Sequence, residues 1–253
     1  MLRSPLAALM LSAALAQPAL SFDMSAMSDA EREAFRGEIR AYLLENPEVL
    51  MEAIGVLEER RAADASQQEL QLIAENRDAI FNDGYSFVGG NPDGDITMVE
   101  FLDYRCGFCT RAFPIIEELV ATDGNIRFVV KEFPILGEAS VLASRYAISA
   151  KMEAGDAVYK ELHDRMMTWN GDINEAALGR ISDGLDLDHE AVLAVMDNPV
   201  IEDIITRNLE LGALLQIQGT PTFLIGDTFV RGFAELDQMQ DLVRLVREEQ
   251  KDG

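Results

Sequence analysis

Basic side chains, cysteine and long apolar runs are all scarce in this chain of 253 residues. There are 21 Lys and Arg against 45 Asp and Glu, which gives a formal net charge of −24. A polyanion of this size is repelled by nucleic acid and by anionic lipid, so the sequence excludes both as partners. Beyond the N-terminus, no apolar stretch approaches the roughly 20 residues that a membrane-spanning helix needs. High solubility is the simplest explanation of the acidity.

Only two cysteines are present, Cys106 and Cys109, and both lie in the stretch DYRCGFCTRAF (residues 103–113). Structural zinc requires four ligands, whereas the only histidines are the distant His163 and His189. A structural disulfide that closes so short a loop constrains little of the unfolded chain. The spacing therefore favours a redox-active dithiol, and neither a metal nor a cofactor is expected.

The first 21 residues have the composition of a secretory signal peptide. Arg3 supplies one positive charge, an apolar run extends from Leu6 to Leu15, and Ala16 ends an A-x-A cleavage pattern. We expect cleavage after Ala16, with Ser21 as the alternative position; an uncleaved N-terminal membrane anchor is the competing interpretation. Export to the periplasm would place the dithiol in an oxidising compartment, where a C-x-x-C pair is more often redox-active.

Residues 22–82 are expected to form a helical arm. Ser28 and Glu31 fit a capping box, and a second helix is predicted from Pro47 to about Asn82. Its polar middle, EERRAADASQQE, has almost nothing to bury. Apolar residues near the front form a stripe: Leu43, Leu50, Ala53, Ile54 and Leu57. This distribution is typical of a stalk that carries an association patch, so self-association through residues 28–60 is predicted. Packing of the arm along its own domain is the alternative.

Residues 83–253 alternate between strand and helix patterns. Strands are predicted around residues 86–88, in 96–104 and in NIRFVVKEFPI, and a hairpin is predicted within TPTFLIGDTFVRGF. A helical block at about 138–217 separates the third strand from the hairpin, and a final amphipathic helix covers residues 235–251. This order predicts an α/β fold with a mixed sheet and a helical insertion.

Cys106 follows a predicted buried strand and opens a helical pattern. A helix N-terminus stabilises an anion, and the thiolate is the form of cysteine that attacks disulfides. Cys106 is therefore predicted to be an exposed nucleophile. Cys109 lies one turn deeper, where it is placed to attack a mixed disulfide and release the substrate.

Three motifs, VEFLDYRCGFC, FPILGEAS and GTPTFLIGD, occur in this order, with the helical block between the last two. Together they resemble the DsbA-like branch of the thioredoxin superfamily over roughly residues 83–250. The arm segment IRAYLLENPEVLMEAIGVLEERR further resembles the N-terminal segment of ScsC-type (suppressor of copper sensitivity) proteins. The resemblance implies a thioredoxin fold, oligomerisation through the arm, and an assembly that shuffles disulfides.

The resemblance also implies further site residues. Pro221 corresponds to the family's cis-proline, and Thr220 to the preceding residue, whose backbone pairs with an extended substrate. Glu100 corresponds to the buried acid beneath the second cysteine, which accepts the proton of Cys109. Lys131, on the neighbouring strand, is predicted to be the partner of Glu100. A solvated glutamate and a snorkelling lysine are the alternatives.

The residues between the cysteines bear on the direction of the reaction. DsbA has Pro-His there and valine before its cis-proline, whereas this chain has Gly107-Phe108 and Thr220, which resemble the isomerase DsbC. Because Phe108 donates no hydrogen bond, we expect a higher Cys106 pKa and a less oxidising potential than in DsbA.

The first hypothesis is a periplasmic protein disulfide isomerase that acts as an oligomer on misfolded or cysteine-containing secreted proteins. A DsbD-like membrane reductase would keep its dithiol reduced. One alternative is a monomeric DsbA-like thiol oxidase recharged by a DsbB-like protein. Another is a copper-tolerance protein whose dithiol binds Cu(I), although the eleven methionines do not cluster near the cysteines.

Overall fold

The computed structural model describes residues 26–252, which divide near residue 62 into two compact units. The predicted signal peptide lies outside the described residues. Within residues 26–252, no helix combines the length and the apolar character that a bilayer crossing requires.

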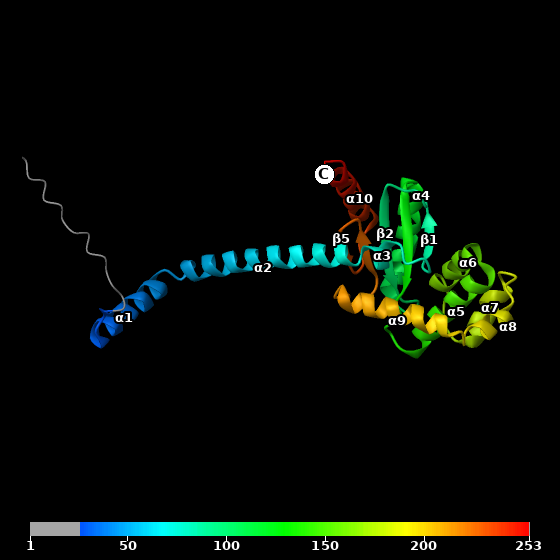
Figure 1. Cartoon of the computed structure of the whole chain (residues 1–253), viewed down its shortest axis with the longest axis horizontal. Coiled ribbons are helices and arrows are strands. Elements are labelled where there is room, and N and C mark those ends of the chain that lie inside the picture. Colours follow the sequence, from blue (N-terminus) through cyan, green and yellow to red (C-terminus); the bar gives the residue numbers. More distant parts are fainter. Residues whose placement is uncertain (1–25, 253) are drawn as a thin grey trace, which may run out of the picture. The chain divides into compact units, whose positions relative to one another are not determined.

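The first unit contains α1 (Asp29–Glu45) and the beginning of α2 (Glu48–Glu75) (Figure 1). The predicted capping box is confirmed: the Glu31 carboxylate accepts from the Ser28 N–H at 2.9 Å, and the Ser28 hydroxyl accepts from the Glu31 N–H at 3.4 Å. α1 buries none of its residues. The helices of this unit therefore expose most of their apolar side chains.

The helix predicted from residue 47 to residue 82 is interrupted at Asn76. The Asn76 amide donates to the Leu72 carbonyl at 2.8 Å, so its side chain takes a helix acceptor at the end of α2. A short helix, α3 (Arg77–Phe81), then begins. The arm was expected to extend to residue 82, but Ile73 and Ile80 are fully buried in a core of the second unit.

The second unit is built around one mixed sheet of five strands in the order β1-β3-β2-β4-β5. The central pair, β2 and β3, is parallel, and the other pairs are antiparallel. The strands are β1 (Phe87–Gly90), β2 (Ile96–Leu102), β3 (Ile126–Glu132), β4 (Thr222–Ile225) and β5 (Thr228–Arg231). This sheet is the mixed α/β arrangement predicted from the sequence.

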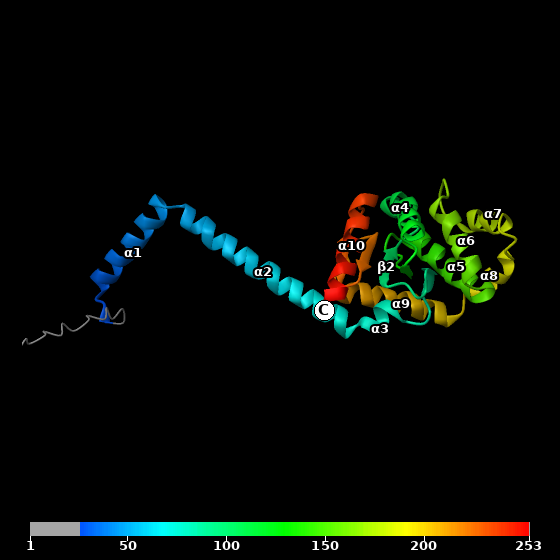
Figure 2. The same cartoon turned by 90° about the horizontal axis from the view of Figure 1, so that it is seen from above.

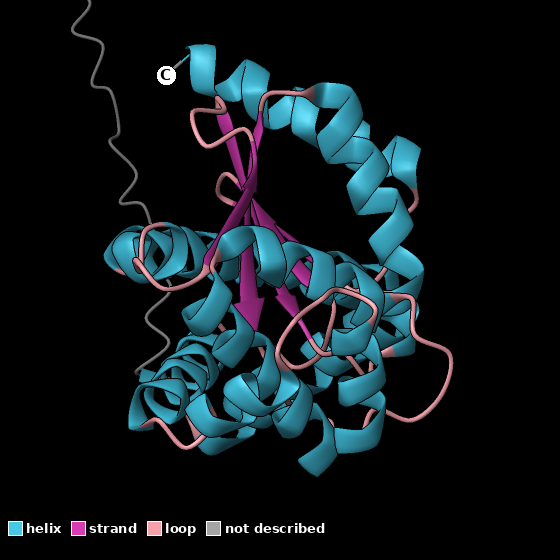
Figure 3. Cartoon of the chain, turned by 90° about the vertical axis from the view of Figure 1, so that its right-hand side faces the viewer, coloured by secondary structure: helices cyan, strands magenta, loops and turns pink. Residues whose placement is uncertain are grey.

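Helices cover both sides of the sheet, as Figures 2 and 3 show. α4 and α10 lie on one side of β2, and α3 and α9 lie on the other. The segment between β3 and β4 is helical, as predicted. The remaining helices are α4 (Gly107–Asp123), α5 (Glu138–Ala154), α6 (Asp156–Met167), α7 (Glu175–Asp183), α8 (His189–Val195), α9 (Pro199–Leu214) and α10 (Leu236–Asp252).

The two sides of the sheet contain separate apolar cores. Along β2, Met98 and Leu102 pack into the core of α4 and α10, whereas Val99 and Phe101 pack into the core of α3 and α9. Side chains alternate in the same way along β3. The parallel register places Glu100 opposite Val130, and this register decides which polar side chains reach the dithiol.

Candidate active site

Cys106 is the N-cap residue of α4, as the sequence predicted. Its backbone is extended, and its N–H donates to the Asp103 carbonyl at 3.0 Å. Its carbonyl accepts from the Thr110 N–H at 3.1 Å and so starts the helix. The β2–α4 connection therefore places the Cys106 sulfur at the positive end of the helix dipole.

The prediction that Cys106 is exposed is wrong, because only 7% of the residue is accessible to solvent. The loop before β4 covers it, and the Cys106 thiol donates to the Thr220 carbonyl at 3.0 Å. The Thr220–Pro221 peptide bond is cis. Cys109 is fully buried, so it lies deeper than Cys106, as expected. Phe108 between them is 56% exposed.

The two thiols differ sharply in proton affinity. The pKa of Cys106 is lowered to about 5, chiefly because the Cys109 thiol donates a hydrogen bond to its thiolate; Thr220 and backbone N–H groups add to this, while burial opposes it. The same hydrogen bond to Cys106, together with burial, raises the pKa of Cys109 far above its usual range. At neutral pH, Cys106 is therefore the nucleophile and Cys109 remains a thiol.

The Thr220 side chain contributes to this asymmetry. Its hydroxyl is buried and, within the described part of the chain, has no hydrogen-bond partner. It helps to lower the pKa of Cys106 by donating to the thiolate. Thr220 thus contacts the nucleophile through its carbonyl, and its side chain favours the ionised form of Cys106.

Glu100 is buried on the same side of the sheet as the dithiol. Its pKa is raised to about 8, chiefly by burial, and the charges of Glu117, Cys106 and Glu132 contribute to this rise. Its charge in turn raises the pKa of Cys109. A carboxyl group with this proton affinity is matched to exchange a proton with a thiol, so the predicted role of Glu100 stays open as a proposal.

The pairing of Lys131 with Glu100 is wrong. Lys131 stands opposite Phe101 in the β2–β3 register, so its side chain points to the other side of the sheet. There the fully buried ammonium forms an ion pair with Asp83 and donates to the Ala79 carbonyl at 2.7 Å. Burial lowers the pKa of Lys131, and Asp83 opposes this. Lys131 is part of a buried structural ion pair, remote from the cysteines.

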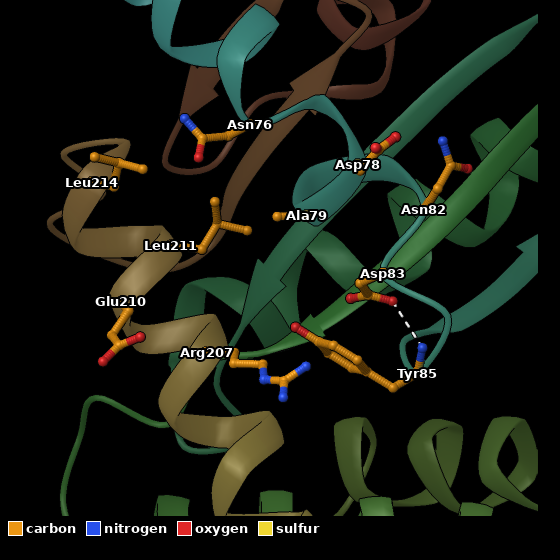
Figure 4. Close-up of a pocket in the computed structure, with 10 residues that line it drawn as sticks. All are labelled: Asn76, Asp78, Ala79, Asn82, Asp83, Tyr85, Arg207, Glu210, Leu211 and Leu214. Atoms are coloured by element: carbon orange, nitrogen blue, oxygen red, sulfur yellow. Dashed lines mark hydrogen bonds between the residues drawn. The ribbon is translucent and has the colours of Figure 1, made fainter.

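A pocket of about 450 Å³ opens on this second side of the sheet (Figure 4). Asp83 and Tyr85 line it together with Arg207 and Leu211 of α9, and the Tyr85 N–H donates to the Asp83 carboxylate at 3.0 Å. Because Leu211 belongs to the core of α3 and α9, the pocket lies across the sheet from the dithiol and forms no part of its site.

Asp103, which the sequence analysis missed, ties the dithiol loop to the loop after β3. Its carboxylate is fully buried and accepts from the backbone N–H groups of Arg105 at 2.8 Å, Ile135 at 2.9 Å and Leu136 at 3.0 Å. Ile135 and Leu136 are exposed apolar residues. An acidic residue three positions before the first cysteine, at the end of a buried strand, was the available sequence signal.

Glu132 is the second residue that sequence reasoning missed. It is buried at the end of β3, and its carboxylate accepts from the hydroxyls of Tyr104 at 2.8 Å, Tyr159 at 2.6 Å and Ser144 at 2.7 Å. These donors come from the β2–α4 loop, α6 and α5. No local pattern brings them together, because Tyr159 and Ser144 belong to the helical insertion.

Thioredoxin-fold proteins exchange disulfides with this kind of pair, a thiolate at a helix N-terminus beside a protonated thiol, and the sheet and site define a protein of that class. The comparison with protein families agrees. The DSBA-like thioredoxin domain matches residues 97–244, and the Copper resistance protein ScsC N-terminal domain matches residues 31–64. The chain belongs to the DsbA-like thioredoxin family, and its site has the geometry for thiol-disulfide exchange.

Solved structures support the assignment. A thioredoxin-like oxidoreductase from Silicibacter pomeroyi DSS-3 is 40% identical, with a TM-score of 0.65, and the match covers 68% of this chain and 98% of that one. ScsC of Proteus mirabilis, in a transitional conformation, is 30% identical with a TM-score of 0.65. That match covers 88% of this chain and 100% of that one, so it includes much of the arm.

Curated relatives match over shorter segments. Disulfide bond formation protein D of Bacillus subtilis is 23% identical over 164 residues, which are 61% of this chain and 73% of that protein. Na(+)/H(+) antiporter NhaA 3 of Salinispora tropica is 27% identical over 138 residues, or 54% of this chain. The chain spans only 21% of the antiporter's length, and we draw no conclusion about ion transport from it.

Proposed function

We propose that this oxidoreductase is a periplasmic protein disulfide isomerase that works as an oligomer joined by its arm. The observation that carries the proposal is the stripe of exposed apolar side chains on α1 and on the front of α2. Nine of them are between 41 and 68% exposed: Phe35, Ile39, Tyr42, Leu44, Leu50, Met51, Ile54, Val56 and Leu57. Helices that expose so much apolar surface gain stability by associating with copies of themselves.

The isomerisation step follows from the asymmetry of the dithiol. The Cys106 thiolate attacks one sulfur of a wrong disulfide, a mixed disulfide forms, and the other substrate sulfur leaves as a thiolate. That thiolate, or another in the substrate, attacks a different disulfide, and a final attack on the mixed disulfide returns Cys106 to its thiolate form. The numbers of electrons and disulfides do not change over the cycle.

Cys109 provides the release of a stalled substrate. Its proton passes to the Glu100 carboxylate, and its sulfur attacks Cys106 in the mixed disulfide. The Cys106–Cys109 disulfide forms while the substrate leaves as a thiolate. Two electrons from a DsbD-like membrane reductase then restore the dithiol. The substrates are misfolded, cysteine-containing secreted proteins, which several dithiols on one assembly would hold together.

The proposal is tested by refolding scrambled ribonuclease with the full chain and with a triple variant, Leu50→Asp, Ile54→Asp and Leu57→Asp. We expect the variant to have the mass of a monomer and an isomerase rate at least about tenfold lower. Burying three unpaired carboxylates in an apolar interface costs too much free energy for the copies to associate. Its Cys106 alkylation rate stays unchanged. A control variant, Ala65→Asp, keeps both the mass and the rate.

A monomeric thiol oxidase is the second candidate, and the lowered Cys106 pKa of about 5 favours it, since a stabilised thiolate makes the disulfide form a stronger oxidant. A monomeric wild-type mass together with rapid oxidation of dithiol peptides would support this candidate and contradict the isomerase.

The third candidate is Cu(I) binding by the dithiol, which the name of the matching ScsC N-terminal domain suggests. Stoichiometric Cu(I) binding without turnover of scrambled substrate would support it.

A further inference from the structure

Two buried carboxyl groups lie on the dithiol side of the sheet, on the adjacent strands β2 and β3, and their surroundings are opposite. Glu132 accepts three hydroxyl hydrogen bonds, two on Oε1 and one on Oε2. Glu100 is equally buried, but its Oε1 has no hydrogen-bond partner among the described residues. One site is built to hold a carboxylate, and the other lacks donors for one.

Hydrogen bonds donated to a carboxylate favour its charged form, whereas burial without donors favours the neutral acid. Two nearby buried carboxyls also avoid being ionised together. Burial raises the pKa of Glu132 to about 7 against its three donors, and raises that of Glu100 to about 8. The first proton lost from this pair therefore leaves Glu132, and Glu100 keeps its proton until the pH approaches 8, above which its carboxylate can act as a base.

We propose that Glu132 is a positioning residue for the release step: its buried charge strengthens Glu100 as the base that takes the proton of Cys109. An ordinary carboxylate is a weak base toward a thiol, and proton transfer is most effective when the two proton affinities are close. The inference rests on the proposed role of Glu100, but it is independent of whether the protein isomerises or oxidises.

Glu117 of α4 is the competing source of this effect, since its charge is the largest of the neighbouring charges that raise the pKa of Glu100, ahead of Cys106 and Glu132. The Glu117 carboxylate, however, is paired with Lys160 at 2.9 Å, and its side chain is 38% exposed. Solvent and the ion pair screen that charge. Glu132 is buried, and among the described residues it pairs with hydroxyls only, so its field reaches Glu100 with less screening.

The ionisable groups around the pair come from every element packed against it. The groups that shift the pKa of Glu100 or Glu132 come from three places. They are Glu117 in α4 and Cys106 at its N-cap, Asp103 and Tyr104 in the β2–α4 loop, and Tyr159 in α6. Cys109 and Tyr159 in turn respond to the charge of Glu100. The pKa values of Tyr104 and Tyr159 are well above the ordinary value, mainly through burial, so both remain phenols and donors.

His163 reports the charge of Glu132. The Tyr104 hydroxyl has one proton, which it donates to Glu132, yet it also lies 3.1 Å from Nδ1 of His163. Nδ1 must then carry the ring proton and donate to Tyr104. The pKa of His163 is lowered to about 3, chiefly by burial and in part by the charge of Lys160, so the ring is neutral. If Glu132 were protonated, Tyr104 could turn its proton to Nδ1 instead.

The test combines carbon-13 titration of the Glu100 carboxyl with the pH profile of substrate release from a mixed disulfide, both in the full chain. Replacing the charge in Glu132→Gln is expected to lower the Glu100 midpoint, and with it the midpoint of the release profile, by about one pH unit. At about pH 9.5, where Glu100 is ionised in both proteins, the weaker base is expected to slow release about threefold. Glu117→Gln, the matched control, is expected to move the midpoint by less than about a third as much.

An unmoved Glu100 midpoint in Glu132→Gln, or an equal shift in Glu117→Gln, would overturn the inference. If Glu132→Gln does not fold, nitrogen-15 spectra of His163 in the unaltered protein decide: a proton on Nδ1 at pH 8 supports it, and a proton on Nε2 contradicts it. The variant Glu100→Gln distinguishes failure of the Glu100 role from failure of the Glu132 role. Unchanged release in that variant refutes Glu100 as the base. The titrations of the Glu100 carboxyl test Glu132 without relying on turnover.

Discussion

The arm and the dithiol domain use apolar residues in opposite ways. In the arm, α1 buries no residue and the apolar side chains of α1 and the front of α2 face solvent. In the domain, two separate cores fill the two sides of one sheet. An isolated helix is marginally stable without a packed face. The domain therefore holds its chemistry within one chain, whereas the arm presents apolar side chains that, in the proposed assembly, other copies of the chain cover.

Replacing Cys106 is expected to abolish the chemistry of the domain without changing the arm. Cys106→Ser removes the nucleophile, so we expect disulfide exchange to fall by roughly 10³-fold or more, with the mass in solution unchanged. Cys109→Ser should instead accumulate mixed disulfides, because release needs the second thiol. Non-reducing gels with a scrambled substrate measure both; free turnover by Cys106→Ser would refute the assignment of the nucleophile.

A second change affects the domain on the side of the sheet remote from the cysteines. Lys131→Met leaves Asp83 as a buried carboxylate without its cation, which typically costs about 3–5 kcal/mol of unfolding free energy. The Cys106 alkylation rate should stay the same, since Lys131 lies on the other side of the sheet. Urea unfolding and iodoacetamide kinetics check the two parts; a changed alkylation rate in the folded variant would restore Lys131 to the site.

A matched pair of truncations sharpens the contrast between buried and exposed apolar residues. Ile80→Ala should destabilise the domain by about 2–5 kcal/mol, because Ile80 is fully buried. Ile54→Ala should change the unfolding free energy of the domain by less than about 0.5 kcal/mol, since Ile54 is 46% exposed. The proposed assembly predicts that Ile54→Ala instead weakens association, which sedimentation at several concentrations measures.

The domain is also expected to show a pH dependence that the arm does not share. Because the Cys106 pKa is lowered to about 5, its thiolate stabilises the folded reduced form above the ordinary thiol pKa of about 8.5. This contribution is lost as the pH falls toward 5. The unfolding free energy of the reduced protein, relative to Cys106→Ser, should rise between pH 5 and pH 8.5, and the alkylation rate should fall only below about pH 5. A rate that instead climbs up to pH 8.5 would contradict the lowered pKa.

Much of this architecture could be read from local patterns. The capping box at Ser28 and Glu31 and the N-cap position of Cys106 depend on residues within one helical turn. The mixed sheet followed from the order of strand and helix patterns. The break at Asn76 was missed because an asparagine that donates to the preceding turn looks the same in a sequence as an exposed one.

The dithiol, its spacing and its place at the start of a helix could be predicted from the sequence, because they are properties of neighbouring residues. Which polar groups face that dithiol depends instead on how the strands pair and the helices pack. Glu100 and Lys131 lie on adjacent strands, yet a shift of one residue in register exchanges the two sides of a sheet, and the observed register separates them. The cover of Thr220 over Cys106 and the hydroxyls around Glu132 come from segments remote in the chain. Such contacts exist only after the sheet and the helical insertion have packed.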